Sequence, residues 1–100
     1  MNEFLVELYV AKRDDAAIAA GWERFSRAAA EVTDAGRPVR LVRSIFVPED
    51  ETCFLLVEAD ADAVVLETAR RASLVCERVV EAAIDISRNG TNHVKQKEKQ

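Results

Sequence analysis

Three glutamates, one arginine and one tyrosine are the side chains with which this sequence could do chemistry on a protein surface. They are Glu7, Tyr9, Arg43, Glu58 and Glu81, and each occurs in a segment with a strand-like pattern. Three carboxylates beside one guanidinium, partly removed from water, would have shifted pKa values. Such a cluster could hold a cation, relay a proton or bind a small polar ligand. The same groups could instead form an ion-pair network that only satisfies buried charge.

The strands that would carry these residues follow from the alternation of apolar side chains. The pattern predicts strands over residues 4–10, 39–47, 52–59 and 76–87. A turn over residues 48–51 joins the second and third strands into a hairpin. The sequence therefore predicts one domain over residues 1–87, followed by a disordered basic tail over residues 88–100.

Two helices are predicted between these strands. The first follows a cap at Asp14 or Asp15, ends near Ala35, and has Trp22 on its apolar, core-facing stripe. The second follows a cap at Asp60 or Asp62 and reaches about residue 73. The resulting order βαββαβ predicts an α+β fold of the ferredoxin-like type, with both helices on one face of the sheet.

The face of the sheet that the helices do not cover is expected to be too apolar to remain exposed to solvent. Each strand should turn its more apolar set toward the helices. In the second strand Arg43 decides the register, because an unpaired guanidinium under the helices is costly; a bulge would reverse this assignment. The expected outer set is Leu5, Glu7, Tyr9, Leu41, Arg43, Ile45, Phe54, Leu56, Glu58, Val79 and Glu81.

An apolar outer face of this extent predicts a partner that covers it. The natural partner is a second copy, which would give a homodimer with facing sheets, a dimeric α/β barrel with a small central cavity. The three glutamates could flank Arg43 in that cavity.

Composition narrows the partners and the compartment. The chain has 100 residues, 49% of them apolar, and a net charge of −4. Residues 88–100 hold four bases and one acid, a net of +3, and residues 1–87 hold 10 bases and 17 acids, a net of −7. An acidic domain is a poor nucleic-acid binder, and no apolar run is long enough to span a membrane. We expect a cytoplasmic protein without nucleic-acid or membrane partners.

The two cysteines do not form a recognisable motif. Cys53 and Cys76 are expected as buried, reduced thiols, with a redox pair or a metal pair as the alternatives. The single histidine, His93, lies in the predicted tail.

Several segments together resemble a family of small bacterial proteins of mostly unknown function that are often described as nickel-binding or nickel-responsive. The resemblance lies in residues 4–7, 39–59, 60–64, 69–74 and 78–81, and covers most of residues 3–84. It implies a ferredoxin-like fold and a homodimer. Nickel-binding members use histidine ligands, and many relatives have one immediately before the serine of the second strand. Here Arg43 stands at that place, and a guanidinium cannot ligate a metal. No cofactor is therefore expected, and only the resemblance to the family would imply that the protein binds nickel.

Three functions remain open at this point. The first is a binding module that holds a small ligand or cation between facing sheets. The second is a cofactor-independent enzyme of the monooxygenase, isomerase or cyclase type. In that enzyme Glu7 or Glu81 would act as base, Arg43 would stabilise an enolate, and Tyr9 would donate a proton. The third is a structural partner protein in which the charges only fix the register of the dimer.

Overall fold

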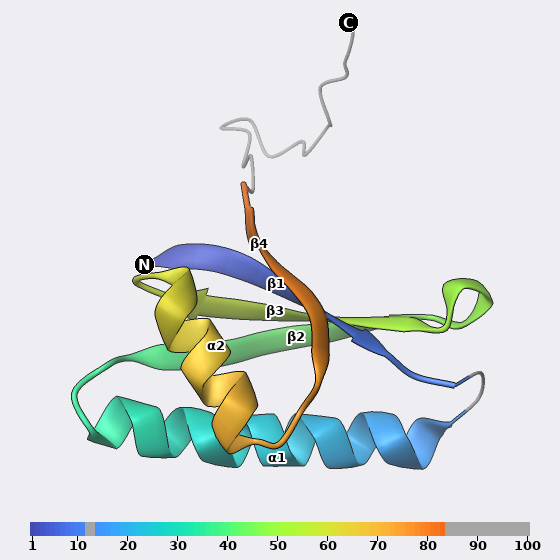
Figure 1. Ribbon diagram of the computed structural model, residues 1–100, viewed down its shortest axis with the longest axis horizontal. Coiled ribbons are helices and arrows are strands. Elements are labelled where there is room, and N and C mark those ends of the chain that lie inside the picture. Colours follow the sequence, from blue (N-terminus) through green and yellow to red (C-terminus); the bar gives the residue numbers. More distant parts are fainter. Residues whose placement is uncertain (12–13, 84–100) are drawn as a thin grey trace, which may run out of the picture.

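The structure, a computed structural model, describes residues 1–11 and 14–83 of the chain (Figure 1). The described elements are β1 (Asn2–Tyr9), α1 (Asp15–Asp34), β2 (Val39–Val47), the 3-10 helix η1 (Pro48–Asp50), β3 (Thr52–Ala59), α2 (Asp62–Arg71) and β4 (Cys76–Ala82). The ferredoxin-like α+β fold predicted from the sequence is confirmed. The tail and His93 lie outside the described residues, as does the part of the predicted fourth strand from residue 84 onward.

The four described strands form one antiparallel sheet in the order β2-β3-β1-β4. Helix α1 contacts β2, and α2 contacts α1, β3 and β4, so both helices cover the same face. Figure 1 shows α2 lying across the strands and α1 running along β2. No helix in the described part of the chain combines the length and hydropathy needed to cross a bilayer.

The core lies between the sheet and the two helices. Alternate residues of the central strands point into it, as the period of two requires. Its members include Phe4, Val6, Leu8, Leu55 and Val57 from the sheet, Phe25, Ala29 and Val32 from α1, and Val64, Val65 and Ala69 from α2.

Helix α1 begins and ends at standard capping signals. The Asp14 carboxylate accepts a hydrogen bond from the Ala17 amide at 3.1 Å, which confirms the predicted cap. At the other end Gly36 has a φ of +100°, and the amides of Gly36 and Arg37 donate to the carbonyls of Thr33 and Val32. These two bonds form a Schellman motif, which satisfies carbonyls that the helix leaves free.

Helix α2 ends in the same motif, but with a serine at the left-handed position. Ser73 has a φ of +57°, its amide donates to the Arg70 carbonyl, and the Leu74 amide donates to the Ala69 carbonyl. The predicted cap at Asp60 or Asp62 is wrong: the N-cap is Ala61, without a side-chain hydrogen bond.

A bulge in the edge strand β2 changes one face assignment. Leu41 pairs with Val57, but Arg43 already pairs with Leu56, so Val42 is an extra residue between them. Leu41, expected on the outer face, therefore shares the helix-covered face with Val57 and packs against the core. Arg43 lies on the outer face as predicted.

A second bulge, in the other edge strand β4, reverses the predicted faces. Leu8 pairs with Cys76 and Glu7 with Arg78, which leaves Glu77 extra. Because one extra residue inverts all following side chains, Val79 packs against the core and Val80 faces outward. Glu81 is opposite Phe4 and so belongs to the helix-covered face, not to the outer face where it was expected.

Candidate functional site

The outer face of the sheet is where the sequence placed the candidate site. Residues paired in an antiparallel sheet share a face, so the pairs define rows across the four strands. In the order β2-β3-β1-β4, one row consists of Arg43, Leu56, Leu5 and Val80. The next row consists of Ile45, Phe54, Glu7 and Arg78. Apolar side chains therefore occupy most of the centre of this face.

Two of the three predicted site glutamates lie on the outer face, and both have arginine partners other than Arg43. Arg40 Nη2 lies 2.9 Å from Glu58 Oε1, and Arg78 Nε lies 3.1 Å from Glu7 Oε1. Arg43 makes no ion pair with any residue in the described ranges. Within the described subunit, the glutamates therefore do not pair with Arg43.

The arrangement required for the enzyme hypothesis is also not assembled within the described subunit. Glu81 lies on the opposite face of the sheet, and Glu7 is bonded to Arg78. Arg43 is on β2, two strand spacings or about 10 Å from β1, because β3 lies between them.

Tyr9 is the predicted site residue that reaches a cavity. It lies at the end of β1 with 61% of its surface exposed, and its hydroxyl donates to Glu51 Oε1 at 3.4 Å. From there its side chain forms part of the wall of a pocket between α1 and the sheet.

This pocket, called the α1 pocket below, has a volume of about 270 Å³. Residues of β1, β3, α1 and the segment after α2 line it. The apolar wall includes Leu8, Ile18, Trp22, Leu55 and Leu74, and the polar groups at the rim include Tyr9, Arg24 and Ser73. Trp22, expected in the core, is half-buried and lines this space instead.

Two local features shape the α1 pocket. The Schellman motif at the end of α2 turns Leu74 back toward the core, where it forms one side of the pocket. Arg24 Nε donates to the Ala72 carbonyl at 3.0 Å, which holds the guanidinium between α1 and the end of α2.

Small residues of α1 form the opposite side. Ala17, Ala20 and Gly21 line the pocket, and Gly21 is buried. A Cβ at Gly21 would meet Leu74 Cδ2 at 4.0 Å, which is ordinary van der Waals contact. Packing in the free protein therefore does not require glycine at this position.

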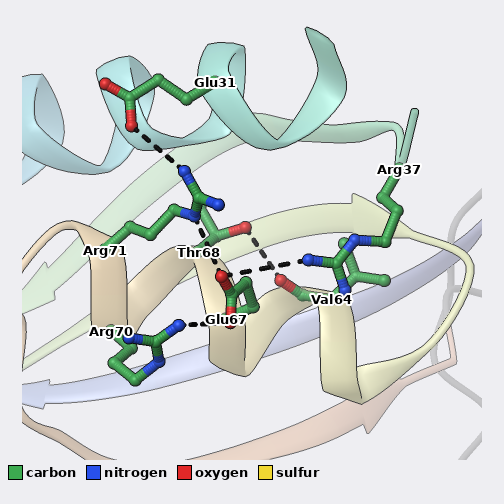
Figure 2. A network of polar contacts seen from close by, with 7 residues as sticks. All are labelled: Glu31, Arg37, Val64, Glu67, Thr68, Arg70 and Arg71. Carbon is green, nitrogen blue, oxygen red and sulfur yellow. Dashed lines mark hydrogen bonds and ion pairs between the residues drawn. The ribbon is translucent and has the colours of Figure 1, made fainter. Parts of the chain in front are cut away.

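An ion-pair network joins the two helices (Figure 2). Glu67 Oε1 lies 2.6 Å from Arg70 Nη2, and Glu67 Oε2 lies 2.9 Å from Arg71 Nε and 3.9 Å from Arg37 Nη2. Hydrogen bonds from Arg70 and Arg71 lower the pKa of Glu67 to about 2. Figure 2 shows Arg71 extending from Glu67 toward Glu31 of α1, at 3.7 Å.

The two cysteines lie on either side of Leu8 in the sheet. Cys53 of β3 and Cys76 of β4 both pair with Leu8 of β1, so their strands are two spacings or about 10 Å apart. A disulfide needs Cα atoms within about 7 Å, so the redox-pair alternative does not apply to this fold. Burial raises the pKa of both thiols. The prediction of a buried free thiol is confirmed for Cys53, whereas Cys76 is only partly buried.

The described residues do not provide the ligand set that the nickel-binding resemblance would need. Within residues 1–11 and 14–83 no group of three or more His, Cys, Asp or Glu side chains is placed to hold a metal ion. At the position where relatives have histidine, Arg43 offers only N–H donors. The site on the sheet therefore does not fit nickel.

Comparison with known proteins supports the fold. No family model matches the chain, and no curated protein matches it. A crystal structure of SCO4226 from Streptomyces coelicolor A3(2) aligns with a TM-score of 0.62 and 15% sequence identity, over 83% of this chain and 98% of that one. Both chains therefore share the small ferredoxin-like α+β fold.

The sequence interpretation missed most of the α1 pocket. The residues that it overlooked include Arg24, Gly21 and Ser73. One signal was present in the sequence: Gly21 lies in the middle of the predicted helix, where glycine costs about 1 kcal/mol relative to alanine.

Proposed function

We propose that the protein binds a small organic molecule in the α1 pocket and works as a homodimer. The observation that carries the binding proposal is a pocket of about 270 Å³ with apolar walls and a polar rim. A closed apolar cavity of about 150 Å³ accommodates benzene, and ligand pockets usually range from about 300 to 1,000 Å³. The ligand should therefore be small, about one ring with a short substituent.

Two residues that line the pocket are of types that the local backbone conformation disfavours. Gly21 lies inside a helix where alanine would fit and would stabilise the helix by about 1 kcal/mol. Ser73 adopts the left-handed conformation that glycine adopts without strain. Gly36, at the equivalent position of the other helix, is away from this pocket and is a glycine. Such departures from local preference support a functional role for the place where they meet.

Trp22 makes the binding proposal directly testable, because it is the single tryptophan of the chain and lines the pocket. Titration with the neutral probe 3-phenylpropanamide should change the tryptophan fluorescence with saturation. Gly21→Leu places a side chain in the pocket without breaking the helix, so it should abolish the saturable change.

A matched variant controls for the loss of fold. Leu66→Ala changes an exposed residue of α2 that does not line the pocket, and it should bind the probe like the unchanged protein. The proposal fails if the probe does not bind at millimolar concentration, or if Gly21→Leu remains folded and binds it equally well.

The outer face of the sheet supports the homodimer. Leu5, Phe54 and Leu56 are only half-covered there, and Ile45 and Val80 are exposed. Four charged side chains on this face form two ion pairs, Arg40 with Glu58 and Arg78 with Glu7, which lowers the cost of burying them. A second copy of the same face would remove this apolar area from water.

Light scattering after size exclusion tests the assembly. The unchanged protein should have twice the 11.1 kDa mass of the chain at micromolar concentration. Ile45→Arg should yield monomers, because it places a charge in the interface. Leu66→Arg should remain dimeric, since Leu66 is on α2 and is equally exposed, at 49% against 47% for Ile45. A monomeric unchanged protein would refute the dimer and leave the pocket proposal intact.

A further inference from the structure

A second, smaller cleft adjoins the α1 pocket and contains three arginines. Its volume is about 150 Å³, and its charged residues are Arg24 and Arg27 of α1, Arg71 of α2, and Glu31. Arg24 and Ser73 line both this arginine cleft and the α1 pocket. The two spaces therefore lie on either side of the same two residues, one with a largely apolar wall and one lined by guanidinium groups.

The surroundings of the arginine cleft have an excess of positive charge. Glu31 is the acid that lines it, against three guanidinium groups. Glu67, the nearest acid of α2 in the network of Figure 2, is already engaged by Arg70 and Arg71. The contact between Arg71 and Glu31 is longer, at 3.7 Å, so it neutralises the cleft only in part.

The arginines differ in how firmly they are held. Arg24 is fixed through Nε by the Ala72 carbonyl, which leaves its two Nη groups as donors at the boundary of the two spaces. Arg71 is fixed through Nε by Glu67. Arg27 makes no hydrogen bond or ion pair to another residue of the described chain, so its whole guanidinium group is available to a ligand.

We propose that the ligand of the α1 pocket is a small organic acid, with its apolar body in the α1 pocket and its carboxylate in the arginine cleft. This inference rests on the binding function proposed above and names its ligand class. A guanidinium group binds a carboxylate through two parallel N–H···O bonds, and Arg24 and Arg27, three residues apart on one helix face, can both face the same group. The ring-sized volume next to them takes the rest of the molecule.

The experiment compares two probes of the same shape, 3-phenylpropionate and its neutral amide 3-phenylpropanamide, by Trp22 fluorescence and calorimetry. The acid should bind at least about tenfold more tightly, because it gains charge-assisted hydrogen bonds. Added salt should weaken binding of the acid and leave that of the amide unchanged.

Charge-removing variants locate the carboxylate. Arg27→Gln should lower the affinity for the acid roughly tenfold and leave the affinity for the amide unchanged. Arg43→Gln removes the same charge from an exposed residue on the opposite face of the sheet that lines neither space, and it should leave both affinities within about twofold. Circular dichroism confirms that both variants are folded.

The outcomes separate the two proposals. If acid and amide bind alike, or if Arg27→Gln weakens both equally, the organic-acid inference is wrong while the pocket proposal stands. If neither probe binds at millimolar concentration, both proposals are wrong. If Arg43→Gln weakens binding of the acid as much as Arg27→Gln does, the effect comes from the overall charge of the protein and the arginine cleft does not bind the carboxylate.

Discussion

The residues at positions 21 and 73 are expected to lower the free energy of unfolding, and substitutions there test by how much. Replacing Gly21 by alanine removes the excess backbone entropy of glycine from the middle of α1, which is worth about 1 kcal/mol. The new methyl group would meet Leu74 Cδ2 at 4.0 Å and would be largely buried, which adds up to about 0.8 kcal/mol. We therefore expect Gly21→Ala to stabilise the protein by about 1–2 kcal/mol.

Ser73→Gly should stabilise the protein for a different reason. Its φ of +57° brings Cβ close to the following carbonyl, a strain of roughly 1–2 kcal/mol that glycine avoids. Glycine gains more entropy than serine on unfolding, which offsets part of the gain, so about 0.5–1 kcal/mol should remain.

Gly36→Ala is the matched control with the opposite sign. The backbone there has a φ of +100°, and no heavy atom lies within 4 Å of the added Cβ, so only backbone strain acts. This variant should lose about 1–2 kcal/mol.

Urea unfolding followed by circular dichroism measures all three variants. The midpoints should shift at an unchanged dependence on urea, because the surface exposed on unfolding stays the same. In thermal unfolding each kcal/mol should move the Tm by about 4–8 °C. A loss of stability in Gly21→Ala would show that the space beside Leu74 is filled, and it would refute the argument that glycine serves the pocket. An unchanged stability in both Gly21→Ala and Gly36→Ala would refute the use of local backbone preferences altogether.

Three further changes test the core, the ion-pair network and a helix cap. Phe25→Ala empties a fully buried position and should cost about 3–5 kcal/mol in urea unfolding; a loss under 1 kcal/mol would contradict the described core. Glu67 has a pKa lowered from 4.5 to about 2, so its ionised form stabilises the fold above pH 4.5, and this contribution is lost as the pH falls toward 2. Glu67→Gln should therefore flatten the loss of stability between these pH values, and an unchanged slope would show that the network does not stabilise the fold. Asp14→Ala should cost about 1 kcal/mol by removing the cap of α1, whereas Asp15→Ala, which lacks that bond, should cost less.

The central strands and the helices could be predicted because each has a regular spacing of apolar residues within its own segment. The strand of residues 52–59 alternates without interruption and has the predicted bounds. The apolar spacing of α1, with Phe25 and Val32 among its buried residues, is equally regular, and Gly36 marks its end. In each case one repeated interval determines which side chains are buried.

The edge strands could not be predicted in the same way. One extra residue, Val42 in β2 and Glu77 in β4, reverses every side chain that follows it. Nothing in the residue types marks these positions, because edge strands accept both polar and apolar residues on either face. The error moved Leu41, Val79 and Glu81 to the wrong face and produced a cluster of glutamates that the subunit does not contain.

The α1 pocket could not be predicted from the sequence for a related reason. Its walls come from four segments that are distant in the sequence, and its shape depends on how the Schellman motif after α2 places Leu74. Periodicity predicts which face of a helix is buried, but it does not predict where the burial is incomplete. Trp22 shows the limit: it lies on the apolar stripe of α1, as predicted, yet it borders an open space.

The two bulges also explain why binding and assembly would use opposite sides of one sheet. The bulge in β4 brings Val80 to the outer face and removes Glu81 from it, which makes that face more apolar than the alternation predicted. Two glutamates remain paired there, Glu58 with Arg40 and Glu7 with Arg78. Paired charges on an apolar face can be buried against a copy of that face at a lower cost than unpaired ones, whereas a ligand needs free donors to fix its orientation. Those donors lie on the helix side, where Arg27 has no partner among the described residues.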